Sequence, residues 1–222
     1  GCSFKMKDSL IYFFNDNNDF PPSVSSILEL EDGSILFSSV DNGAFIIKDK
    51  VVSSIKKVNG LIDNSIVTSF KDNLNNIWFG GNQEGLSKFS KNEFVNFTTS
   101  NGLLSNELFA INQDTKNNYW FGTLSNGVSK YDGNNFQHYT VDQGLNNNAI
   151  KSICCAKNGD VWIGTEGAGI AKISSDIFSH KTIKEGLSNN WVWAISQGLN
   201  NEFLFATNEG GITKKDNTSY YS

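Results

Sequence analysis

The chain has 222 residues, of which 38% are hydrophobic, 13% aromatic and 18% charged, the proportions of a globular protein with a sizeable core. Its formal net charge is −5 and all 18 basic residues are lysine, so neither a basic surface for nucleic acid nor an arginine site for carboxylate or phosphate groups is expected. No apolar run approaches the roughly 20 residues that cross a bilayer, so we expect membrane attachment only through segments outside this chain.

A 42-residue repeat runs through the whole chain. Glycine recurs at this spacing, which divides the chain into units 1–42, 43–84, 85–126, 127–168 and 169–210 and a partial unit 211–222. Each unit holds four short strand candidates; in the fourth unit they are 128–131, 136–140, 149–154 and 161–164, with the hairpin signal Asn158-Gly159 before the last. This pattern predicts an all-β protein, a β-propeller of four-stranded antiparallel blades.

The first residues of the chain fall in the same register. Cys2 shares its position in the repeat with apolar strand residues: Ala44, Leu86, Val128, Ile170 and Ile212. We therefore expect Cys2 to be a strand thiol rather than a lipid anchor. Because the partial unit 211–222 duplicates the half-unit at the start, we expect about five blades that form an arc of a larger ring of the seven-bladed type.

Other positions recur because the scaffold needs them. Large aromatic rings at one position are expected to pack between blades, each with a partner for its N–H group, and glycines two residues later allow strands to approach closely. An asparagine after each Gly-Leu pair is expected to close a loop by a hydrogen bond. These scaffold positions are Trp78, Trp120 and Trp162; Gly80, Gly122 and Gly164; and Asn64, Asn106, Asn148 and Asn190.

The combined motif resembles the two-component regulator propeller repeat. It appears as Gly144-Leu145 with Asn148, then Asn158-Gly159, then Trp162-Ile163-Gly164-Thr165, and again in the preceding unit. The resemblance implies a periplasmic sensor propeller of a bacterial signalling receptor such as a histidine kinase, on the outer side of the inner membrane. Such receptors often sense carbohydrate and are able to act as dimers, so a small molecule or an oligosaccharide is the ligand that the resemblance implies.

Candidate ligand-binding residues are those that vary at positions the scaffold leaves free. On the inner strands one such position is filled by Phe109, Lys151 and Trp193, and the position two residues earlier by Glu107 and Trp191. Trp191 and Trp193 flank Val192, so both should project to one side of the strand, where indoles suit stacking on a sugar ring. The alternative interpretation is that they plug the channel or pack against a further blade.

Neither the histidines nor the cysteines predict a metal site or a cofactor. His138 and His180 occupy equivalent positions on outer strands of adjacent blades, too far apart to share an ion. Cys154 and Cys155 are adjacent in a strand and should point to opposite faces, which disfavours a shared metal and an ordinary disulfide and leaves a strained vicinal disulfide as the alternative.

Two other functions remain open at the level of sequence. A glycosidase of the sialidase type would need an arginine cluster and a pair of catalytic carboxylates, and the chain offers no arginine and no convincing pair. We therefore predict no catalytic residue in this segment. A propeller that binds another protein is the remaining alternative, although the tryptophans are never followed by the aspartate of the WD type.

Overall fold

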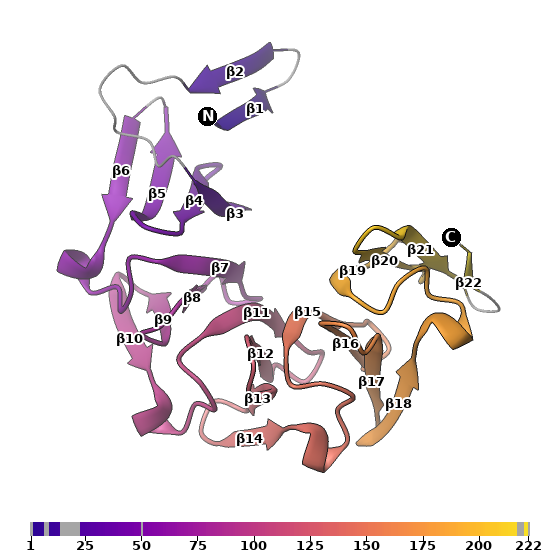
Figure 1. Cartoon of the computed structure of the whole chain (residues 1–222). Helices are drawn as coiled ribbons and strands as arrows, with labels where there is room; N and C mark the ends of the chain where they lie inside the picture. Colours follow the sequence, from indigo (N-terminus) through magenta and orange to yellow (C-terminus); the bar gives the residue numbers. More distant parts are fainter. Residues whose placement is uncertain (1, 7–8, 14–22, 50, 217–219, 222) are drawn as a thin grey trace. The chain divides into compact units, whose positions relative to one another are not determined.

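The computed structural model describes residues 2–6, 9–13, 23–49, 51–216 and 220–221, the first ten and the last two by their backbone only. The chain divides into two compact units, Gly1–Phe97 and Thr98–Ser222, each of which is considered by itself. Figure 1 labels the strands of both units. No helix in the described ranges is long and apolar enough to span a membrane.

In its described residues, the first unit holds one two-stranded and two four-stranded antiparallel sheets. A 3-10 turn, η1 (Lys57–Asn59), stands between the two larger sheets. The strands are β1 (Cys2–Met6) and β2 (Ser9–Phe13); β3 (Val24–Glu29), β4 (Ile35–Ser39), β5 (Gly43–Lys48) and β6 (Val51–Ile55); and β7 (Ile66–Lys71), β8 (Ile77–Gly81), β9 (Leu86–Ser90) and β10 (Glu93–Phe97). Cys2 thus begins a strand.

The described part of the second unit holds three more four-stranded sheets, each preceded by a 3-10 turn. The turns are η2 (Thr99–Asn101), η3 (Val141–Gln143) and η4 (Ile183–Glu185). The strands are β11 (Leu108–Gln113), β12 (Tyr119–Thr123), β13 (Val128–Tyr131) and β14 (Phe136–Tyr139); β15 (Ile150–Cys155), β16 (Val161–Thr165), β17 (Ile170–Ser174) and β18 (Ile177–Lys181); and β19 (Val192–Gln197), β20 (Phe203–Thr207), β21 (Gly211–Lys215) and β22 (Tyr220–Tyr221).

These sheets are propeller blades, as the repeat predicts. Strands that follow one another along the chain pair antiparallel in every sheet, and the strands predicted for the fourth unit lie within one residue of the observed bounds. The repeat unit is nevertheless out of phase with the blade, because residues 127–168 contain the last two strands of one sheet and the first two of the next. A larger ring built from such blades remains a prediction.

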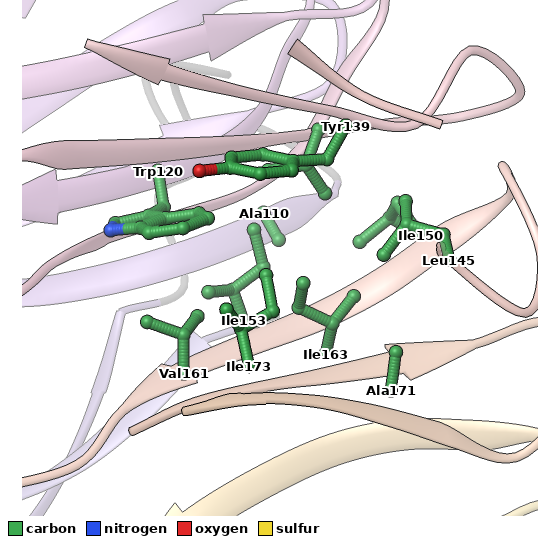
Figure 2. Close-up of a cluster of buried hydrophobic side chains, with 11 residues drawn as sticks. Ala110, Trp120, Tyr139, Leu145, Ile150, Ile153, Val161, Ile163, Ala171 and Ile173 are labelled. Atoms are coloured by element: carbon green, nitrogen blue, oxygen red, sulfur yellow. The ribbon is translucent and has the colours of Figure 1, made fainter. Parts of the chain in front are cut away.

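The hydrophobic core of the second unit forms between neighbouring sheets. Figure 2 shows Trp120 of β12 facing Ile153, Val161 and Ile173, which belong to the following sheet. The Trp120 ring is buried and stacks on the Tyr139 ring at 5.4 Å. Within this unit, neighbouring blades therefore bury apolar faces against one another, as expected for stacked repeats.

The recurring glycines and asparagines have the structural roles that the sequence predicts. A Cβ atom on Gly122 would lie 2.6 Å from Cγ2 of Ile150, so only glycine lets the next inner strand approach. The Asn148 Oδ1 atom accepts a hydrogen bond from the backbone N–H of Val141 at 2.9 Å, which closes the loop around η3. The same bond is made by Asn64, Asn106 and Asn190.

Candidate functional site

A β-bulge lies near the start of the first strand of each four-stranded blade. In β11, β15 and β19 the register with the next strand skips one residue, between Leu108 and Ala110, between Ile150 and Ser152, and between Val192 and Ala194. The skipped residues are Phe109, Lys151 and Trp193, three of the five predicted ligand-binding residues. A bulge frees its extra residue from the ladder and re-aims the side chain, which explains why these positions vary.

Lys151 is the centre of a cluster built from three consecutive blades. Its Nζ atom lies 4.6 Å from the ring centroid of Phe109 and 5.3 Å from that of Trp193. The same atom forms an ion pair with Oε2 of Glu166 at 2.7 Å, although the Lys151 side chain is only 6% exposed. A buried ammonium needs such compensation from a carboxylate and from aromatic faces.

Trp191, just before β19, and Trp193, within it, extend the cluster on one side. Their rings stack with centroids 5.9 Å apart and an interplanar angle of 16°, so both project to the same side of the strand, as predicted. Trp193 is 44% exposed, and its Nε1 atom donates to Oδ1 of Asn208 at 3.3 Å. The Nε1 atom of Trp191 is buried and has no hydrogen-bond partner within the described part of the chain.

Glu166 and Asn208 were not predicted from the sequence. Each follows the second strand of its blade, and its side chain contacts the bulge residue of the same blade. The backbone N–H of Glu166 donates to the carbonyl of Ala149 at 3.0 Å, and that of Asn208 to the carbonyl of Trp191 at 2.9 Å, so the scaffold places both residues in the same way. Glu166 and Asn208 occupy equivalent positions in the repeat, and this equivalence was the signal in the sequence that could have identified them.

Glu107 is not brought into the cluster by any hydrogen bond or ion pair among the described residues. It lies just before β11, where its backbone N–H donates to Oγ of Ser105 at 3.2 Å. Its carbonyl accepts from the backbone N–H of Leu124 at 3.2 Å. The other four predicted residues come together, and we define the cation–aromatic cluster as Phe109, Lys151, Glu166, Trp191, Trp193 and Asn208.

The repeated tryptophans Trp78 and Trp120 have a structural role at the other end of the blades. The Nε1 atom of Trp78 donates to Asp72 Oδ2, and that of Trp120 to Asp114 Oδ2, each at 2.9 Å. Trp162 departs from the prediction that every indole N–H has a partner, since its buried Nε1 atom has none in the described residues. The reason is that Ala156 stands where the other two blades have the aspartate, so the indole N–H finds no carboxylate there.

Comparison with a protein family identifies the repeat. The family model described as two component regulator propeller matches residues 144–167, the segment that runs from the Gly-Leu pair through the tryptophan strand. Residues 144–167 therefore carry the two-component regulator propeller repeat. No curated protein sequence matches the chain significantly.

Solved structures that share this fold include two sensor domains. The extracellular domain described as that of hybrid two component system BT3049 from B. thetaiotaomicron has a TM-score of 0.80 at 23% identity, over 94% of this chain and 29% of that one. The extracellular domain of one component system BT4673 from the same organism has a TM-score of 0.74 at 17% identity, over 90% of this chain and 30% of that one. The chain thus spans less than a third of either sensor domain.

An enzyme shares the fold as well. Virginiamycin B lyase from Staphylococcus aureus has a TM-score of 0.73 at 16% identity, over 99% of this chain and 75% of the lyase. Identities at this level show the propeller fold alone, so the site has to be judged by its own residues.

Both histidines contact polar groups of the protein itself. His138 lies on β14 with its Nδ1 atom 3.2 Å from the Ser129 hydroxyl, and His180 lies on β18 with its Nε2 atom 2.9 Å from the carbonyl of Gly144. Burial lowers the pKa of His138, and a hydrogen bond with the Gly102 backbone offsets only part of the effect. No group of three or more His, Cys, Asp or Glu residues suited to a metal occurs in the described ranges.

Cys154 and Cys155 are free thiols on opposite faces of β15. Cys154 belongs to the core shared with Phe203 and Phe205, whereas Cys155 packs against the core around Trp120. Burial raises the pKa of both thiols above the ordinary value, so neither is suited to nucleophilic or redox chemistry at neutral pH.

Proposed function

We propose that this regulator propeller is part of the ligand-binding region of an extracytoplasmic bacterial sensor, and that the cation–aromatic cluster binds a neutral carbohydrate. The observation that carries the proposal is the combination of groups that the cluster leaves accessible. The Trp193 indole is partly exposed, and the Glu166 side chain that pairs with Lys151 is 36% exposed. Asn208 is held at the same place by its bond to Trp193.

Sugars match this combination because they have two kinds of surface. Their C–H faces contact indole rings, while their hydroxyl groups donate to carboxylate and amide oxygens and accept from amide N–H groups. The unpartnered N–H of Trp191 offers one further donor for a hydroxyl that reaches it. The stacked rings and the ion pair order the side chains before a ligand arrives, which lowers the entropic cost of binding.

Binding rather than catalysis is the role that the cluster suits. Its one carboxylate, that of Glu166, is already paired with the Lys151 ammonium at 2.7 Å. Glycoside hydrolysis needs two carboxyl groups with separate acid and base roles. The extracellular sensor domains that share the fold support the extracytoplasmic location that we propose.

A binding screen with a paired mutant tests the proposal. A panel of neutral oligosaccharides is screened by thermal shift, and hits are measured by calorimetry on the parent protein and on the double variant W191A/W193A. We expect the double variant to keep its fold and to bind at least about tenfold more weakly, a loss of about 1.4 kcal/mol. Glu166→Gln should weaken binding as well, because it removes the ionised acceptor.

Leu199→Ala is the matched control, because Leu199 is a 92% exposed apolar residue of the same blade, in the turn at the far end of β19. Its affinity for the sugar should equal that of the parent. Unfolding of W191A/W193A would instead assign the two rings to packing. Unchanged affinity in a folded double variant would contradict the proposed site.

A further inference from the structure

A cleft lies at the opposite end of β15 from Lys151. The cleft has a volume of about 640 Å³ and is bounded by the sheet β15–β18 and the sheet β19–β22. It opens beside the turn that joins β15 to β16. The residues that decide its chemistry are Lys157, Asp160, Trp162, Lys172, Lys181 and Lys215.

The repeat itself shows what this cleft lacks. In the two preceding blades the tryptophan is covered by an aromatic ring of the fourth strand, Phe97 over Trp78 at 6.0 Å and Tyr139 over Trp120 at 5.4 Å. At the position equivalent to Tyr139, the blade of Trp162 has Lys181. An ammonium on a flexible stem thus replaces the ring of the fourth strand.

A ring from the next blade compensates for part of this loss. Phe203 of β20 packs on Trp162 with the ring centroids 4.7 Å apart. The equivalent residue in the blade that packs against Trp120 is Val161, which has no ring. Trp162 is therefore 3% exposed even though no ring of its own blade covers it. The packed indole forms part of the wall of the cleft.

The carboxylate cap is missing from the same blade. Asp72 and Asp114 each accept the indole N–H of their own blade, and Ala156 takes their place beside Trp162. The buried Trp162 Nε1 atom has no partner among the described residues. A buried donor without an acceptor is costly, and an oxygen atom at the position of the missing carboxylate would remove that cost.

The charge around the cleft is positive. Lys172 pairs with Asp160 at 2.7 Å. Burial opposes ionisation of Asp160, but hydrogen bonds from Lys172 and neighbouring polar side chains outweigh burial and lower its pKa. Asp160 thus neutralises one of the four lysines. Lys157 and Lys181 form no ion pair within the described part of the chain, so their charges are available to a ligand.

We propose that this cleft binds an anionic ligand through its carboxylate, sulfate or phosphate oxygens. One oxygen accepts the Trp162 N–H where the aspartate of the other blades would sit, and the ammonium groups of Lys157 and Lys181 neutralise the charge. The site is independent of the cation–aromatic cluster and does not depend on the function proposed for it. Charge-assisted hydrogen bonds supply most of the affinity, so binding should weaken as ionic strength rises.

Calorimetry with three probes on the whole protein tests this site. The probes are trigalacturonate, inorganic sulfate and pyrophosphate, which separate a carboxylate source from a sulfate and a phosphate source. We expect saturable binding of at least one probe, weakened tenfold or more by Lys157→Ala with Lys181→Ala. The variant A156D/K181Y, which restores the carboxylate and ring of the preceding blade, should lose binding while its thermal stability stays equal or rises.

Two controls make the outcome decisive. Lys116→Ala removes a lysine from the corresponding turn of the preceding blade, where Asp114 and Tyr139 cap and cover the tryptophan, and it should leave binding unchanged. W191A/W193A should also bind the anionic probe like the parent, so failure of the sugar site and failure of this cleft remain distinguishable. The proposal is overturned if no probe binds saturably, or if Lys116→Ala weakens binding as much as the cleft variants.

Discussion

At the scale of single residues, Asp114 connects a turn to the core. Its carboxylate accepts four hydrogen bonds, from the backbone N–H groups of Lys116 and Asn118, from Nδ2 of Asn118 and from Nε1 of Trp120. Burial would raise the pKa of Asp114, but these hydrogen bonds outweigh it and lower the pKa. The ionised form therefore stabilises the fold above the unfolded-state pKa of about 4, and the contribution is lost as pH falls through the lower folded-state pKa.

The first prediction follows from this network. Asp114→Ala should lower the free energy of unfolding at pH 7 by about 2 kcal/mol or more, because the buried Trp120 N–H loses its acceptor. Urea denaturation measures the difference, which should shrink below about pH 4 as the parent carboxylate becomes protonated. Asp132→Ala is the control: Asp132 caps an exposed turn without a buried donor, and its loss should matter less. Equal losses for the two variants would contradict the network.

At the scale of elements, the 3-10 turns control how one blade leads into the next. In η3, Thr140 accepts from the backbone N–H of Asp142 and Gln143 bonds back to Thr140, while Gly144 ends the turn with φ of 117°. A Cβ atom at Gly144 would lie 2.8 Å from Cδ2 of Phe178 on β18. Both the left-handed backbone and the adjacent ring thus require glycine here.

The second prediction separates these two requirements. Gly144→Ala should cost about 2–4 kcal/mol of stability, because backbone strain and displacement of the Phe178 ring add together. Gly133 has φ of 102° but no atom within 4 Å of the place that a Cβ atom would take, so Gly133→Ala should cost only the strain, about 1 kcal/mol. Thermal denaturation of both variants measures the contrast. A cost for Gly144→Ala no larger than that for Gly133→Ala would rule out the ring contact.

At the scale of the molecule, the cation–aromatic cluster depends on three blades of the second unit. Phe109 lies on β11, Lys151 on β15 and Trp193 on β19, so the contacts between them join separate sheets. The Lys151 side chain is nearly fully buried, and Glu166 supplies the counter-charge for its ammonium group. Neighbouring blades are therefore coupled through a polar contact in addition to their apolar cores.

The third prediction concerns this coupling. Glu166→Gln should destabilise the protein by about 2 kcal/mol, because it leaves the Lys151 ammonium buried without a counter-charge; the partial exposure of Glu166 reduces the full cost of breaking a buried pair. Adding Lys151→Met should recover most of the loss, and urea denaturation of the four proteins in the cycle measures the coupling energy. Neutralising the exposed Lys48–Asp32 pair with Asp32→Asn should change stability little. Additive effects at Lys151 and Glu166 would contradict the coupling.

Much of the candidate site could be predicted because the repeat marks equivalent positions. The position filled by Phe109, Lys151 and Trp193 changes its residue type from unit to unit, whereas the scaffold positions keep theirs. This contrast was enough to select the three residues. Glu107 was selected by the same rule, yet the structure shows no bond that joins its side chain to the cluster. Glu166 was missed because its partnership with Lys151 depends on the bulge in β15, which re-aims the lysine side chain, and spacing along the chain does not show which side chain that lysine meets.

The amino-acid sequence alone determined the blades of this protein: strand periodicity, turn residues and the 42-residue spacing are local properties that each unit expresses in the same way. Only the tertiary structure decided which side chains meet. It joined Lys151 to Glu166. It also showed that the lysine at 181 and the alanine at 156, far apart along the chain, change the surroundings of the same tryptophan, Trp162. The physical reason is that such contacts depend on strand register and on the approach of neighbouring sheets, which spacing along the chain does not contain.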